Sequence, residues 1–227
     1  MDLTAELKLP APEGGDFAAC IERASIIVFT IRLWCDPSVT MPVFADRSFG
    51  VLASMEANDR ARVAPLEASP RFFALEPVNR EGMAAKLAWV QANWTKAEAL
   101  YRQSQEFRIA ADALSAGQFV RNDALALISL WGALEALFSP STTELKFRVS
   151  ALMAAYLEAP GRCRLAKQKE IAALYDKRSA AAHGKPRHSS DDLLNTFNLT
   201  RSVLLRMIRD EAVPSKQKLE ELLFGCP

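Results

Sequence analysis

The sequence contains few residues of the kinds that bind metals or cross-link chains. Its four cysteines stand at positions 20, 35, 163 and 226, with no Cys-x-x-Cys pair among them, and its two histidines are His183 and His188. A structural zinc site needs four nitrogen or sulfur ligands close together, so we expect no metal site and no cofactor. The same spacing gives no basis for disulfides, and four free thiols are typical of the reducing cytosol.

No apolar run in the sequence is long enough to cross a membrane. The longest, at 24–35, has about twelve residues and includes Arg32, whereas a membrane-spanning helix needs roughly 20. The first fifteen residues are acidic and contain proline and glycine, so they lack the basic start and apolar centre of a secretory signal. We therefore expect a cytoplasmic protein that does not contact a membrane.

The charge balance excludes one class of nucleic-acid-binding protein. With 28 Lys and Arg against 27 Asp and Glu, the net charge of +1 does not suit a protein that binds nucleic acid through its whole surface. The charge is uneven along the chain, however, because residues 160–188 contain eight basic and two acidic residues. A local patch of this kind can attract an anionic backbone.

The composition changes near residue 78. Before it, prolines are frequent and no helical period persists. Residues 26–34 are rich in β-branched and aromatic side chains and predict a strand, and residues 39–44 predict a second, shorter one. Two strands are marginally stable alone, so we interpret residues 1–78 as a small β-containing N-terminal appendage that packs on the rest of the chain or on a partner.

After residue 78 the apolar residues recur at helical spacing almost throughout. Residues 141–144 have the sequence of a capping box, which would open the third of the helices that follow. We expect residues 79–227 to form an up-and-down bundle of about five helices, which makes the fold class mainly α. The pattern predicts helices at 83–101 with a continuation at 107–114, at 122–138, at 144–157, at 162–182, after Ser189 or Ser190, and from Pro214 onward.

The sequence YDKRSAAAHG at 175–184 is the segment that indicates chemistry. Arg178 follows Leu174 by four residues, so it lies on the apolar face of its helix, and a guanidinium there needs a carboxylate, a phosphate or a neighbouring subunit. Gly184 ends the helix directly after His183. The arginine and the histidine are then about 140° apart around an ideal helix, and fraying of the last turn would let both face one cleft.

Glu135 is the only acidic residue between Ala124 and Phe138, a segment that is apolar nearly all round. If Glu135 is buried, its carboxylate needs a cation, and Arg178 is the natural candidate. Alternatively, Glu135 lies on a narrow exposed stripe. The basic residues of 160–188 can likewise be a solvated face, with Arg178 as an ion-pair partner in the core and His183 as a favourable charge at a helix end. The spacing leaves these alternatives open.

Taken together, these residues resemble the HEPN superfamily, and specifically its Apea-like branch. The family motif is an arginine followed after four to six residues by a histidine near the end of a helix, which here is Arg178 to His183. The resemblance covers about residues 105–210, roughly half of the chain. The surroundings that match the branch are Tyr175 before the arginine, Ser179 after it, Gly184 after the histidine, and the upstream segment Leu130 to Phe138, which contains Glu135.

The resemblance implies a metal-independent endoribonuclease of antiphage, toxin or stress-response systems, working as a homodimer in which two motifs share one cleft. His183 would act as general acid and base on the 2′-hydroxyl and the leaving oxygen, and Arg178 would stabilise charge on the scissile phosphate. Single-stranded RNA is the expected substrate, because attack by the 2′-hydroxyl needs a flexible backbone. The residues expected to support the site are Glu135, Tyr175, Ser179 and Gly184, and those expected to bind RNA are Lys177, Lys185, Arg187 and His188.

Two other functions remain compatible with the same residues. Many HEPN domains have lost catalysis, so the chain can instead be a non-catalytic module that binds RNA or a partner, or that dimerises, through the same face. The third possibility is purely structural, with Arg178 and Glu135 as a buried ion pair. Lys185 stands where toxins silenced by adenylylation carry a tyrosine, so we do not expect that form of regulation.

Overall fold

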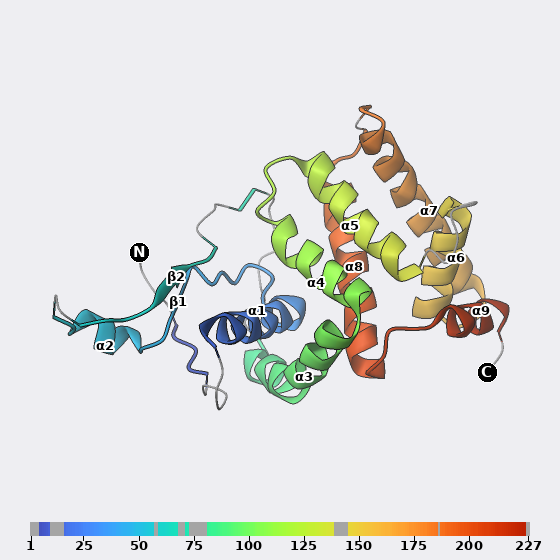
Figure 1. The fold of residues 1–227 in the computed structure, drawn as a ribbon. Helices are drawn as coiled ribbons and strands as arrows, with labels where there is room; N and C mark the ends of the chain where they lie inside the picture. The colour runs from blue at the N-terminus through green and yellow to red at the C-terminus, as the bar shows by residue number, and fades with distance from the viewer. Residues whose placement is uncertain are drawn as a thin grey trace.

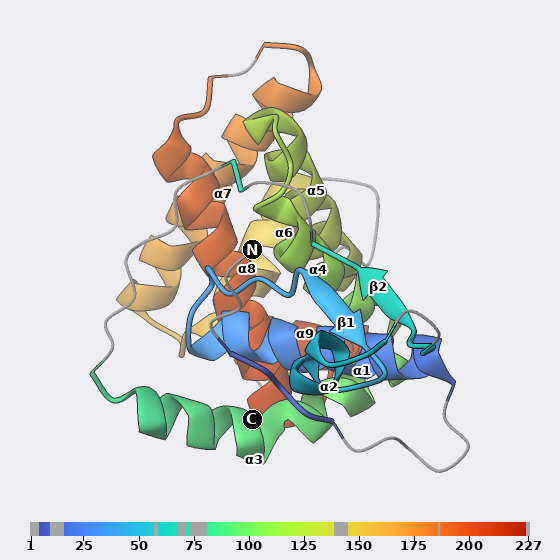
Figure 2. The same ribbon diagram turned by 90° about the vertical axis from the view of Figure 1, so that its left-hand side faces the viewer.

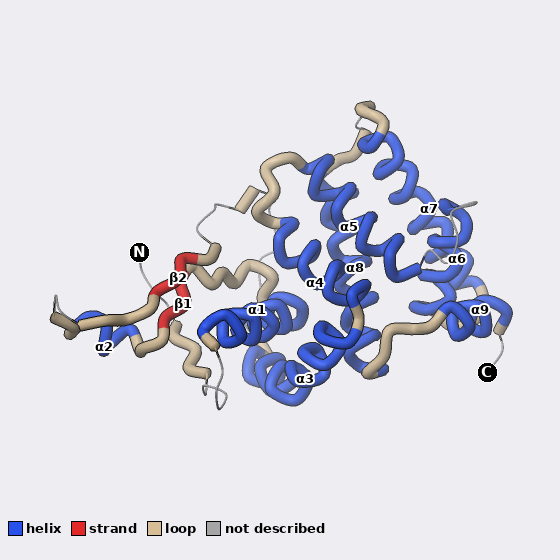
Figure 3. Tube along the Cα trace, in the orientation of Figure 1, coloured by secondary structure: helices blue, strands red, loops and turns tan. Residues whose placement is uncertain are grey.

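The computed structural model describes residues 5–9, 16–56, 59–67, 71–72, 81–138, 145–185 and 187–225. Within these ranges the chain is mainly helical, with a single two-stranded sheet, and this confirms the expected fold class at that level (Figures 1 and 3). In chain order the elements are α1 (Phe17–Trp34), β1 (Val43–Ala45), α2 (Phe49–Ala53), β2 (Val63–Pro65), α3 (Met83–Gln103), α4 (Gln105–Gly117), α5 (Asp123–Phe138), α6 (Leu145–Leu157), α7 (Arg162–Ala182), α8 (Ser190–Asp210) and α9 (Lys216–Phe224).

Helix α5 is the central helix of the bundle. It packs against α4, α6, α7 and α8, and the side chains of Leu127, Leu130 and Trp131 are completely buried. A helix that is apolar on nearly all sides must be enclosed in this way, because any exposed face would leave apolar surface in water. The site discussed below lies where α7 packs on α5.

The described part of the chain after residue 82 has seven helices, whereas about five were expected. One reason is a break at Ser104, which divides the predicted continuation of 83–101 into α3 and α4. Ser104 is extended, with φ −122° and ψ 120°, and its hydroxyl accepts a hydrogen bond from the Phe107 amide at 3.2 Å. It therefore starts a new helix as an N-cap residue. The predicted capping box at 141–144 lies outside the described residues.

The strand predicted at residues 26–34 is wrong, because these residues form the second half of α1. Ile26, Phe29 and Leu33 are buried at helical spacing, and the Phe29 ring meets the Phe107 ring of α4 edge to face with centroids 6.3 Å apart. β-Branched residues favour strands only weakly, and burial of this apolar face on α3 and α4 outweighs that preference.

The rest of the N-terminal region contains the only sheet among the described residues. Strands β1 and β2 pair antiparallel, with Val43 opposite Pro65 and Ala45 opposite Val63, so the predicted strand at 39–44 is present only at its end. Together with α2, this sheet lies outside the helical bundle, on the α1 side (Figures 1 and 2). Residues 1–78 thus include a small sheet, as expected, but they also supply α1 to the core of the bundle. The expected boundary near residue 78 falls within 73–80, outside the described residues.

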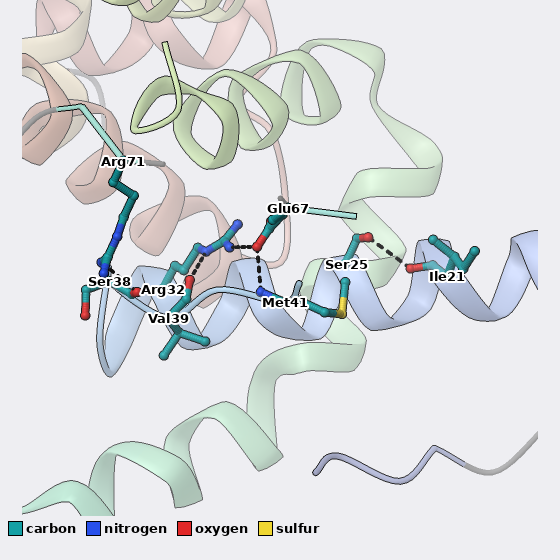
Figure 4. Close-up of polar contacts among 8 residues, drawn as sticks. All are labelled: Ile21, Ser25, Arg32, Ser38, Val39, Met41, Glu67 and Arg71. Atoms are coloured by element: carbon teal, nitrogen blue, oxygen red, sulfur yellow. Dashed lines mark hydrogen bonds and ion pairs between the residues drawn. The ribbon is translucent and has the colours of Figure 1, made fainter. Parts of the chain in front are cut away.

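An ion pair fixes the base of this projecting region to α1. The Arg32 side chain is almost completely buried, pairs with the Glu67 carboxylate, and donates from Nε to the Val39 carbonyl at 2.8 Å. The same Glu67 oxygen accepts a hydrogen bond from the Met41 amide at 2.6 Å (Figure 4). One buried charge pair therefore holds the segments on both sides of the sheet. Among the helices that the structure describes, none combines the length and apolarity needed to span a membrane.

Candidate functional site

The C-terminal end of α7 has the geometry of a Schellman motif. Helix α7 spans the predicted residues, and Gly184 follows its C-cap, His183, in the left-handed conformation with φ 70°. The Gly184 amide donates to the Ala181 carbonyl at 3.2 Å, and the Lys185 amide donates to the Ala180 carbonyl at 3.0 Å. Glycine adopts this backbone without a steric penalty, and it thereby sets where His183 leaves the helix. The His183 side chain is exposed there.

Arg178 is joined to α5 through Glu135. Its Nη2 donates to Glu135 Oε2 at 3.0 Å, and the two side chains are 23% and 18% exposed. The sequence left two alternatives open for Glu135, and the structure shows the ion pair with Arg178 and not the exposed stripe. The carboxylate satisfies the charge that Arg178 brings to the apolar face of α7, as a partly buried guanidinium requires.

Two aromatic side chains pack beside this ion pair. Trp131 and Tyr175 meet edge to face, with ring centroids 5.1 Å apart, and the Arg178 guanidinium carbon lies 5.5 Å from the Tyr175 centroid. Burial and the neighbouring Glu135 carboxylate both raise the pKa of the Tyr175 hydroxyl, which therefore stays protonated at neutral pH. These four residues form one cluster between α5 and α7. Trp131 was not singled out from the sequence, since a tryptophan in an apolar helix indicates only a core position.

Three polar atoms in this cluster are buried without a hydrogen-bond partner among the described residues: Trp131 Nε1, Glu135 Oε1 and Arg178 Nε. Two of these atoms are donors and one is an acceptor. The guanidinium of Arg178 therefore keeps hydrogen-bonding capacity beyond its ion pair.

Arg178 and His183 are not joined directly. In the described ranges no hydrogen bond connects the two side chains; one is half-buried against α5 and the other is exposed at the helix end. Ser179, between them, is half-buried, and its carbonyl accepts the His183 amide at 3.1 Å.

The expected RNA-binding residues differ in their availability. Lys177 donates to the Arg187 carbonyl at 3.2 Å and pairs with Asp192 at 3.4 Å, so its charge is partly neutralised and it holds the loop between α7 and α8. Lys185 and Arg187, in that loop, are exposed. These two are therefore the cations of the loop that remain open to an anion beside the α7 end.

His188 faces a different element. It lines a shallow pocket with Arg121 and the first residues of α5, and its buried Nδ1 has no hydrogen-bond partner in the part of the chain described. Arg121 was not identified from the sequence, because it stands outside the basic segment 160–188. Arg121 lies near His188 because the tertiary structure places the start of α5 beside the loop that follows α7.

The described residues contain no group of three or more His, Cys, Asp or Glu side chains that could hold a metal ion. No family model, curated protein or solved structure matches this chain.

Proposed function

We propose that the chain is a metal-independent endoribonuclease of HEPN type that cleaves single-stranded RNA in a defence, toxin or stress setting. The observation that carries the proposal is the arrangement at the end of α7. At that end the imidazole of His183 is exposed, and it comes five residues after Arg178, whose guanidinium is oriented by Glu135. The adjacent loop presents Lys185 and Arg187. Cations of this kind attract the RNA backbone, and the imidazole can reach a substrate in solvent.

The chemistry follows from these two side chains. His183 takes the proton from a ribose 2′-hydroxyl, whose oxygen attacks the adjacent phosphorus. The bond from phosphorus to the 5′-oxygen breaks, and that oxygen is protonated by an imidazolium, which leaves a 2′,3′-cyclic phosphate and a 5′-hydroxyl. Arg178 stabilises the negative charge that gathers on the phosphoryl oxygens. Imidazole exchanges protons near neutral pH, so no metal is needed for these steps.

A second copy of the chain would complete the cleft. Within one chain the guanidinium is half-buried and the imidazole exposed, and a homodimer would bring two helix ends together so that the residues of one serve the other. The assembly state follows from light scattering of the purified protein, which we expect to give twice the mass of one 25.0 kDa chain.

The experiment is cleavage of a fluorescently labelled single-stranded RNA in the presence of a chelator. We expect His183→Ala to lose cleavage by at least about a hundredfold, in line with the removal of a general acid–base group. Lys169→Ala is the matched control, because Lys169 is an exposed cation on the same helix far from its end. Equal cleavage by the wild type and His183→Ala would refute the proposal.

The second candidate is a non-catalytic module that binds RNA. The observation that favours it is the ion pair itself, since Glu135 already neutralises Arg178 at 3.0 Å. Under this alternative neither the wild type nor His183→Ala cleaves RNA, and both bind it with equal affinity. The same two proteins and the same labelled RNA therefore distinguish the two candidates.

A further inference from the structure

A concave site far from the α7 end lies between α1, the end of α3 and α4. It is a cavity of about 370 Å³, within the range of small-molecule sites. Its walls are mainly apolar, with Ile26 and Phe29 from α1 and Phe119 after α4. None of the described residues that line this cavity belongs to the cluster of Trp131, Glu135, Tyr175 and Arg178, so a ligand bound here is independent of the proposed ribonuclease activity.

The positive charge in this cavity is already engaged. Arg32 is 3% exposed, and its guanidinium pairs with Glu67 and donates to the Val39 carbonyl at 2.8 Å (Figure 4). The guanidinium carbon also lies 5.7 Å from the centroid of the Phe119 ring. An anionic ligand would have to compete with the Glu67 carboxylate for the same donors. The Arg32 guanidinium, which is already paired, therefore does not attract an anion into the cavity.

The Asp112 carboxylate is exposed to solvent where it lines the cavity. Asp112 lines the cavity and accepts one hydrogen bond, from the Tyr101 hydroxyl at 2.8 Å. In the ranges that the structure describes, Asp112 forms no ion pair, and desolvation raises the pKa of its carboxyl group. The Arg108 charge lowers the pKa of the Asp112 carboxyl group, and the Glu22 charge raises it. Asp112 thus has room for a cationic partner.

We propose that this cavity binds a small organic amine, with its apolar body between Ile26, Phe29 and Phe119 and its ammonium group on the Asp112 carboxylate. Among the residues that the structure describes, the charged side chains that line the cavity are Arg32, Glu67 and Asp112, and their charges sum to −1. This balance favours a cation over an anion of the same size. The apolar walls supply binding energy by burial, and the charge-assisted hydrogen bond to Asp112 supplies selectivity.

The test compares two probes of one shape, 2-phenylethylamine and 2-phenylethanol, by calorimetry and by amide chemical-shift changes in the full chain. We expect the amine to bind about tenfold more tightly than the alcohol, because a hydrogen bond to an ionised group is stronger than one between neutral groups. The shifts should be centred on Phe29, Asp112 and Phe119. Equal affinity for the two probes, or no binding of the amine at tens of millimolar, would overturn the proposal.

Three variants locate the binding. Asp112→Asn keeps an acceptor for Tyr101 and should abolish the preference for the amine, whereas Asp191→Asn, at an exposed position on α8, should keep it. Ala116→Phe fills the cavity from an exposed position and should abolish binding of both probes. An unchanged unfolding midpoint for Ala116→Phe shows that the loss is not due to misfolding. Retention of the amine preference in Asp112→Asn would contradict the proposal.

Discussion

Arg178 and Glu135 form an ion pair at 3.0 Å that joins α7 to α5, although 43 residues separate them in the sequence. The pair lies beside the edge-to-face contact of Trp131 and Tyr175, so a charged and an aromatic contact hold the same two helices together. Whatever the chain does, this pair determines how the guanidinium is oriented. Arg178 therefore contributes to stability and, in the proposed function, to catalysis, and experiments have to separate these two contributions.

The first prediction concerns the energy of that pair. We expect Arg178→Ala and Glu135→Ala each to lower the free energy of unfolding by about 1–3 kcal/mol, since each leaves a partly buried charge without its partner. The double variant should lose less than the sum of the two. Urea denaturation of the four proteins gives the coupling energy of the cycle. Additive losses would show that the two side chains do not stabilise each other.

The second prediction concerns the end of α7. Gly184 has φ 70°, so Gly184→Ala should destabilise the protein by about 1 kcal/mol and disturb the position of His183. Gly132→Ala is the matched control with the opposite sign. Gly132 lies exposed within α5, and a Cβ there has no heavy atom within 4 Å, so alanine should stabilise the helix by about 0.5–1 kcal/mol. Thermal unfolding of both variants measures the contrast.

The third prediction concerns alkaline pH. The chain has three tyrosines, Tyr101, Tyr156 and Tyr175, and burial raises the pKa of each hydroxyl. The folded state therefore holds these protons more tightly than the unfolded state, so the stabilisation is fully present below about pH 10 and decreases as the pH rises further. Tyrosinate absorbance should appear at higher pH in the native protein than in urea. Coincident titrations would contradict the burial of these hydroxyls.

The fourth prediction concerns the attachment of the projecting sheet. Glu67→Ala leaves the Arg32 guanidinium buried without its carboxylate and should cost about 3 kcal/mol. Glu220→Ala is the control, because Glu220 is exposed on α9, and it should change stability by less than about 0.5 kcal/mol. Urea denaturation compares them. Similar small losses would mean that Glu67 contributes no more than a surface charge.

The fifth prediction concerns RNA affinity. Changing Lys185 and Arg187 together to alanine should weaken binding of single-stranded RNA and reduce the slope of log affinity against log salt by about 1.4, or about 0.7 for each lost phosphate contact. The control is the double alanine variant of Arg162 and Lys169, which are exposed near the start of α7. Fluorescence anisotropy over a range of salt concentrations gives both slopes. An equal change in the control would indicate a general charge effect and no defined site.

The local sequence was sufficient to predict the bounds of α7. Gly184 ends the helix because glycine tolerates positive φ, and this depends on neighbouring residues alone. The sequence also offered Glu135 as the partner of Arg178, because Glu135 is the only acid between Ala124 and Phe138, but the structure was needed to exclude an exposed position for Glu135. Helix α1 could not be predicted in this way. Residues 26–34 are apolar nearly all round, so neither a period of two nor one of 3.6 stands out.

The tertiary structure alone decided how distant segments meet. Packing of α1 on α3 and α4 makes residues 26–34 a helix, and it brings together the residues that line the cavity beside Asp112. It also placed Arg121 beside His188, although they are 67 residues apart in the printed sequence. Local backbone preferences act over a few residues and can be inferred from them. Cavities and pairs of distant residues depend on which apolar faces bury one another, and that is a property of the whole chain.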